Sequence, residues 1–132
     1  MLELDILPQD LEEAIEILKT FYGELQLDKI KLLSEKDYVN SVHFHHGMFI
    51  RNSWQLWWYF GHPYEGWSKT QPKLNKWFNE IEITHADDMS SIILTCLYRN
   101  LKGKPYNIEK QVAKYHKHWK KNGYPDGIPK HN

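Results

Sequence analysis

Apolar residues recur every three to four positions along most of this chain, which is the spacing of one face of an α-helix. Asp10 and Ser34 stand where helix N-caps are expected, each with an acidic residue three positions later. We find no convincing strand pattern. The sequence therefore predicts an all-α fold, a compact single domain of about five helices over residues 1–132. The helical segments are 10–22, a weaker 25–33, 35–51, 72–82, 83–104 and 107–122.

The segment 35–51 differs from the others because its apolar side chains surround the helix axis instead of forming a stripe. A helix that is apolar nearly all round is typical of a buried position. We therefore expect this helix to be central, with the other helices around it. Gly47 interrupts it at a cost of about 1 kcal/mol relative to alanine, which indicates close approach of another backbone or a ligand.

Two segments are predicted to lack regular structure. Residues 52–70 hold four of the six tryptophans and are interrupted by Gly61, Pro63 and Gly66, so we expect an aromatic-rich loop. Residues 124–132 are predicted to form a turn and an extended C-terminal tail.

Composition narrows the class of protein. The 132 residues carry no net charge, and 41% are hydrophobic, as in a globular chain. No apolar run is long enough to span a membrane, and the acidic N-terminus does not resemble a secretory signal. The single cysteine, Cys96, excludes an intrachain disulfide and a cysteine-based zinc site. We therefore expect a cytoplasmic protein with no membrane association, no metal and no other cofactor.

The charges are distributed unevenly along the chain. The balance is −6 over residues 1–40, −1 over 41–98 and +7 over 99–132. Either the two ends of the chain lie together and neutralise each other, or the basic third faces an anionic partner. The neutral total makes a dedicated nucleic-acid-binding protein the less favoured interpretation. Four lysines form one stripe of the last predicted helix: Lys110, Lys114, Lys117 and Lys121.

Three side chains are candidates for catalysis: His43, His85 and Asp88. An acid at one helix start, beside a histidine or Arg51, would supply a general base and its orienting partner. A structural role explains the same residues, since Thr84 or His85 can cap a helix whose dipole favours Asp87 and Asp88 in its first turn. We expect Arg51 to form an ion pair with this helix start, with Asp88 as the preferred partner.

The densest group of candidate binding residues begins at the end of the predicted central helix. Arginine, an amide and stacking aromatic rings suit a nucleotide-like anion, and they equally suit a protein interface or an aromatic core. The candidate partner- or ligand-binding residues are Arg51, Asn52, Trp54, Trp57, Trp58 and Trp67.

Two motifs of this chain resemble a bacterial family of small proteins described as a domain of unknown function. The first pattern is His-Phe-x-x-Gly-Met-x-Ile-Arg-Asn-x-Trp-x-Leu-Trp, and the second is His-Pro-Asp-Asp-Met-Ser. The matching residues are His43, Phe44, Gly47, Met48, Ile50, Arg51, Asn52, Trp54, Leu56 and Trp57, then His85, Asp87, Asp88, Met89 and Ser90. Ala86 replaces the proline that is frequent in the family, and the loop 58–71 is longer than usual. The resemblance extends over about residues 8–120 and implies no particular activity.

These observations favour a non-catalytic binding protein of the bacterial immunity or regulator type, which contacts a partner protein through an aromatic patch. The alternative is a protein or enzyme that binds a small anionic, nucleotide-like ligand in a pocket of His43, Arg51, Asn52, His85 and Asp88.

Overall fold

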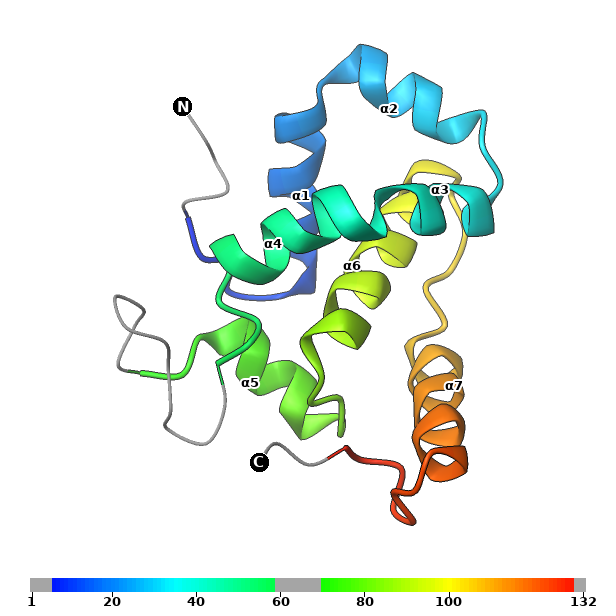
Figure 1. Ribbon diagram of the computed structural model, residues 1–132. Coiled ribbons are helices and arrows are strands. Elements are labelled where there is room, and N and C mark those ends of the chain that lie inside the picture. Colours follow the sequence, from blue (N-terminus) through cyan, green and yellow to red (C-terminus); the bar gives the residue numbers. More distant parts are fainter. Residues whose placement is uncertain (1–5, 59–69, 130–132) are drawn as a thin grey trace.

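The computed structural model describes residues 6–58 and 70–129 (Figure 1). Every regular element within these ranges is helical, which confirms the predicted all-α fold. The elements are α1 (Leu11–Tyr22), α2 (Glu24–Lys31), α3 (Glu35–Val42), a π-helical turn (His43–Gly47), α4 (Met48–Ser53), α5 (Lys73–Glu80), α6 (Ala86–Leu101) and α7 (Ile108–Lys121). Because α3, the π-turn and α4 follow without a break, the described chain has six helical rods where about five helices were expected.

Parts of two predicted segments lie outside the described residues. These are positions 59–69 of the aromatic-rich loop, which include Trp67, and positions 130–132 of the tail. The described helices start where the sequence predicts. The Asp10 carboxylate accepts a hydrogen bond from the Glu13 amide at 2.8 Å, and the Ser34 hydroxyl accepts one from the Asp37 amide at 3.1 Å. No described helix is long and apolar enough to cross a membrane.

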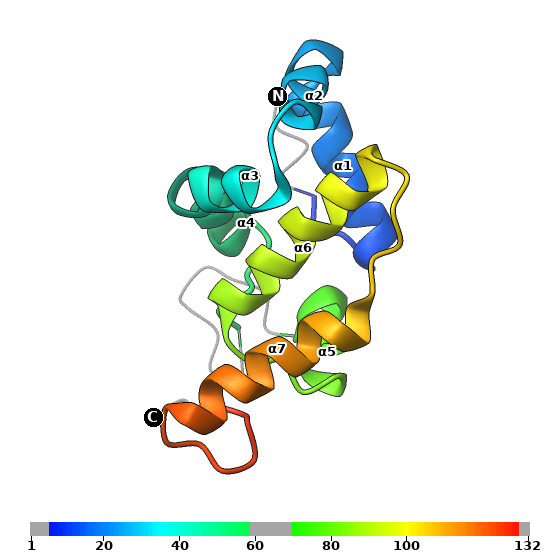
Figure 2. The same cartoon turned by 90° about the vertical axis from the view of Figure 1, so that its right-hand side faces the viewer.

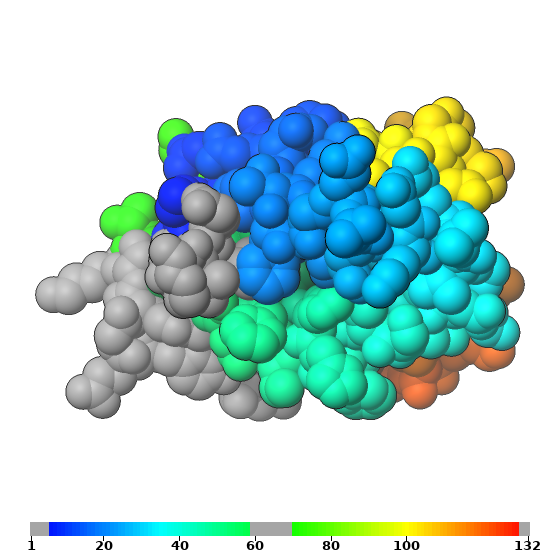
Figure 3. All heavy atoms as spheres, turned by 90° about the horizontal axis from the view of Figure 1, so that it is seen from above, coloured from blue at the N-terminus to red at the C-terminus, as the bar shows by residue number. Residues whose placement is uncertain are grey.

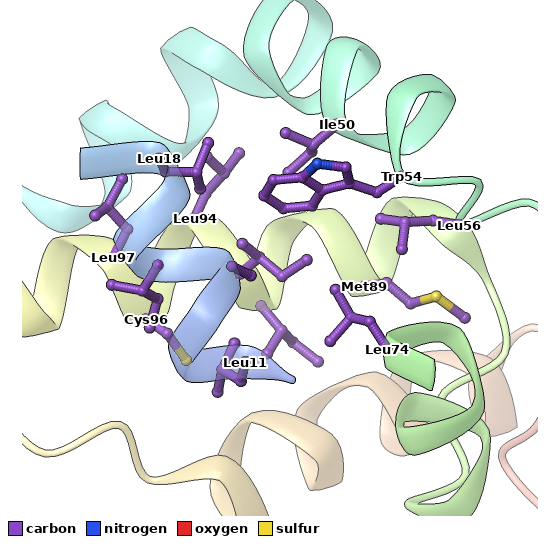
Figure 4. Close-up of a cluster of buried hydrophobic side chains, with 14 of the residues drawn as sticks. Leu11, Leu18, Ile50, Trp54, Leu56, Leu74, Met89, Leu94, Cys96 and Leu97 are labelled. Atoms are coloured by element: carbon purple, nitrogen blue, oxygen red, sulfur yellow. The ribbon is translucent and has the colours of Figure 1, made fainter. Parts of the chain in front are cut away.

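The centre of the domain is α6, with α1, the α3–α4 rod and α7 packed against it (Figures 1 and 2). Ten of its sixteen residues are buried. The spacing within residues 83–104 predicts a buried face that ends at Leu101, and Met89, Ile92, Ile93, Cys96 and Leu97 are buried whereas Leu101 is only partly buried. Figure 4 shows side chains from α1, α4 and α5 meeting those of α6 in this core. The expectation that residues 35–51 form the buried central helix is therefore wrong.

The π-turn explains why the pattern of residues 35–51 misled. In an α-helix each residue turns by about 100°, so Tyr38 and Ile50 would lie about 120° apart on an unbroken helix. A π-helix bonds residue i to i+5 and so accommodates about one additional residue per turn. This reduces the angle between Tyr38 and Ile50 to about 20°, and both side chains are buried. With the π-turn counted, Tyr38 and Ile50 lie on one buried side of the rod, whereas Phe44, Met48 and Phe49 are exposed, so apolar side chains on opposite sides of the rod do not make it a buried helix.

Candidate functional site

Arg51 lies in a buried position between α4 and the start of α6, where it is 6% exposed. Its guanidinium donates from Nη1 to the Ser90 hydroxyl at 2.8 Å and from Nη2 to the His43 carbonyl at 3.3 Å. Its Nε lies 3.3 Å from the Asp87 carboxylate. Burial lowers the pKa of the guanidinium and Asp87 raises it, and an arginine remains charged under such conditions. Arg51 therefore fastens the π-turn and α4 to α6.

Gly47 leaves room for this guanidinium. A β-carbon added at Gly47 would lie 2.8 Å from Nη1 of Arg51 and 3.7 Å from the Ser90 hydroxyl. The predicted close approach at Gly47 is thus present, but the neighbour is a side chain of the same rod and not another backbone or a ligand. Gly47 has ordinary helical dihedral angles, so the space beside Arg51, and not backbone conformation, requires glycine.

Asp88 faces away from Arg51, so the predicted Arg51–Asp88 ion pair is wrong and Asp87 takes its place. Neighbouring residues of a helix point about 100° apart, which turns Asp87 toward α4 and Asp88 toward α7. The buried Asp88 carboxylate accepts a hydrogen bond from Nε1 of Trp119 at 2.8 Å. Burial raises its pKa, although this hydrogen bond acts in the opposite direction. Asp88 therefore joins α6 to α7.

His85 caps α6, as the sequence predicts. Its Nδ1 accepts a hydrogen bond from the Asp87 amide at 3.1 Å. The imidazole stacks on Trp119 with a centroid distance of 5.5 Å and contacts Trp57 edge-on at 5.4 Å. His85 and Asp88 thus share one aromatic partner on α7.

His43, the third catalytic candidate, contributes its backbone carbonyl to Arg51, and its half-buried ring packs edge-on against Phe44. The structure brings Arg51, Asp87 and Ser90 together, and it joins His85 and Asp88 through Trp119. Within residues 6–58 and 70–129, no three His, Cys, Asp or Glu side chains gather as a metal ion would require.

The aromatic candidates divide between core and surface. Trp54 and Trp58 are buried, and Nε1 of Trp54 has no hydrogen-bond partner among the described residues. Trp57 is half-buried against His85, whereas Asn52 is exposed. Arg51, Trp54 and Trp58 therefore expose at most 6% of their surface in this structure.

Three large apolar side chains that were not among the candidates lie on the surface of the same rod. Phe44 is 73% exposed, Met48 51% and Phe49 55%. With the π-turn taken into account, they share one side of the rod with Asn52, opposite the buried side. We call these four residues the contact face. Figure 3 shows the molecule from above, with α1 and α2 in blue and the α3–α4 rod in cyan to green on the visible surface. The sequence could have indicated this face through the helical spacing of Met48, Phe49 and Asn52, counted from Gly47 onward.

The architecture and this arrangement define a small helical domain with an internally bonded arginine and an exposed apolar face. The chain belongs to the family described as a domain of unknown function, DUF6794, whose model matches residues 7–101. This confirms the resemblance, and the matched region ends with α6, before α7. No curated protein and no solved structure matches the chain.

Proposed function

We propose that this protein is a non-catalytic binding protein of the bacterial immunity or regulator type, and that the contact face binds a partner protein in the cytoplasm. The observation that carries the proposal is the exposure of Phe44, Met48 and Phe49 on one side of the same rod. Contiguous apolar side chains on a surface mark interaction sites, whereas scattered ones are ordinary.

The rod beneath the contact face is held rigidly, which favours binding. The Arg51 guanidinium joins it to α6 at two points, and the hydroxyl of Tyr22 on α1 lies 2.6 Å from Nδ1 of His46. A preorganised face loses little conformational freedom when a partner binds. π-turns are frequent at functional sites, and Phe44 lies within this one.

The catalytic candidates support this interpretation over the enzymatic alternative. Nδ1 of His85 accepts from a backbone amide, and Asp88 accepts from Trp119. Arg51 uses all three of its nitrogen atoms within the domain. These groups have structural partners and stabilise the packing of α4 and α7 on α6.

The proposal can be tested by comparative affinity capture from an extract of the native host. The bait proteins would be the wild type, a triple variant of the contact face (Phe44→Ser, Met48→Ser, Phe49→Ser), and a control variant of α2 (Leu25→Ser, Leu32→Ser). The control residues are 81% and 87% exposed, so their substitution also removes exposed apolar side chains, but at another site. We expect a protein that binds the wild type and the control but not the triple variant, and that forms a complex with the purified wild type.

Thermal melting of all three proteins would show that the substitutions leave the fold intact, because every changed side chain is at least half exposed. The proposal would be abandoned if no captured protein distinguished the triple variant from the control.

A further inference from the structure

A second surface feature lies on the other side of α6, where α7 runs beside it (Figure 2). A hollow of about 160 Å³ opens between the start of α3, the second half of α6 and the start of α7. Its walls are formed by Glu35, Thr95, Arg99, Asn107, Lys110, Gln111, Lys114 and Tyr115. Shallower depressions adjoin it and add Lys36 and Lys104 to the lining. We call this feature the basic hollow.

The basic hollow is strongly positive. Its lining has five cationic side chains, Lys36, Arg99, Lys104, Lys110 and Lys114, and one carboxylate. That carboxylate, Glu35, is neutralised by Arg99, whose Nε and Nη2 donate to its two oxygens at 2.7 and 3.1 Å. The hydrogen bond from Arg99, with the charges of Lys104 and Lys114 adding to it, lowers the pKa of Glu35. An excess of positive charge therefore remains for an external anion.

The floor of the hollow is fixed and its rim is available for binding. Gln111 is buried, and its Nε2 donates to the Tyr106 carbonyl at 2.8 Å. Arg99 also donates to this carbonyl, so the loop before α7 is held in place. In contrast, the ammonium groups of Lys104 and Lys110 make no ion pair or hydrogen bond with the described residues. They can therefore bind a ligand without breaking internal contacts.

We propose that the basic hollow binds a small anion that carries two or more phosphate groups. Lysine acts as a point-charge donor to phosphate, and Lys104, Lys110 and Lys114 approach from two sides. The central hollow of about 160 Å³ is below the size of pockets that enclose drug-sized ligands, and the adjoining depressions of about 330 and 320 Å³ extend it along the lysines, which suits a short chain of phosphate groups. This binding site is independent of the contact face. Its α7 side also lies beyond the region that matches the family.

The test uses inorganic pyrophosphate as the probe, with isothermal titration calorimetry at about 0.15 M salt to reduce long-range attraction. The site variant is Lys110→Gln, Lys114→Gln. The matched control is Lys117→Gln, Lys121→Gln, which removes the same charge from exposed positions of the same helix that do not line the hollow. We expect the wild type and the control to bind alike and the site variant to bind at least about tenfold more weakly.

The proposal would be overturned by no binding to the wild type, or by equal weakening in the two variants, which would show only a general effect of charge. We further expect tripolyphosphate to bind more tightly than pyrophosphate, and sulfate more weakly. If a double-stranded oligonucleotide displaced pyrophosphate and its binding depended equally on Lys117 and Lys121, the lysine stripe would track a nucleic-acid backbone and the small-anion proposal would be rejected.

Discussion

Gly47→Ala tests whether the space for the Arg51 guanidinium is as tight as the structure indicates. Because Gly47 has helical dihedral angles, alanine alone would stabilise the rod by about 1 kcal/mol. The new methyl group, however, would lie 2.8 Å from Nη1 of Arg51. The guanidinium is buried and bonded on three sides, so moving it away from Ser90 breaks a hydrogen bond to a charged group.

The loss of such a hydrogen bond costs about 1.5–3 kcal/mol, which exceeds the gain in helix propensity. We therefore expect Gly47→Ala to lower the free energy of unfolding by about 0.5–2 kcal/mol, measured by urea denaturation. The melting temperature should fall by about 2–6 °C.

Repeating the substitution in an Arg51→Met background provides the control. Methionine has no guanidinium to displace, and Asp87 is partly exposed and stays hydrated without its partner. In this background Gly47→Ala should stabilise the protein by about 0.5–1 kcal/mol, so the sign of the effect reverses. If the substitution stabilised the protein in both backgrounds, the proposed contact between Gly47 and Arg51 would be refuted.

Three further predictions concern buried polar groups. Burial raises the pKa of Asp88 above its ordinary 3.8, so the folded state holds this proton more tightly. Asp88→Asn should therefore gain stability relative to wild type as the pH rises from that value through the raised pKa. Tyr22→Phe removes the contacts of its hydroxyl with Tyr38 and His46 and should lower the free energy of unfolding by about 1–2 kcal/mol. Burial raises the pKa of Cys96 to about 11, so its thiol should react with a disulfide reagent only after unfolding.

Each of these predictions has a measurement and a contrary outcome. A stability difference between Asp88→Asn and wild type that does not change with pH would contradict the first, as measured by urea denaturation over a pH series. An unchanged melting temperature of Tyr22→Phe would contradict the second. Rapid colour development with native protein in a thiol assay would contradict the third.

The sequence predicted the helices that are regular and amphipathic. The caps at Asp10 and Ser34 depend on local hydrogen bonds, and the buried face of α6 depends on a single helical repeat of about 3.6 residues. Both can be recognised from the spacing of residues in the sequence. The prediction for the α3–α4 rod was wrong because a single π-turn changes the angular position, around the rod axis, of every side chain after Gly47. This shift hid the exposure of Met48 and Phe49.

The interactions that join residues distant in the sequence were harder to predict from it. The sequence indicated that Arg51 meets the start of α6, but the choice between Asp87 and Asp88 depends on how that helix is rotated. For the basic hollow, the sequence indicated only that residues 99–132 carry an excess of positive charge. Its Glu35–Arg99 pair joins residues that are 64 positions apart, a proximity that no local pattern encodes.

The shallow seating of α7 has a consequence for the exchange of backbone amide hydrogens with solvent. Only Gln111 among its residues is buried, whereas α6 is buried along most of its length. Its apolar side chains Ile108, Val112 and Tyr115 are only partly buried against the core, so α7 should open through a local fluctuation while the other helices remain packed. In deuterated water, amides in the middle of α7 should therefore exchange well before those in the middle of α6, whose exposure requires unfolding of the whole domain.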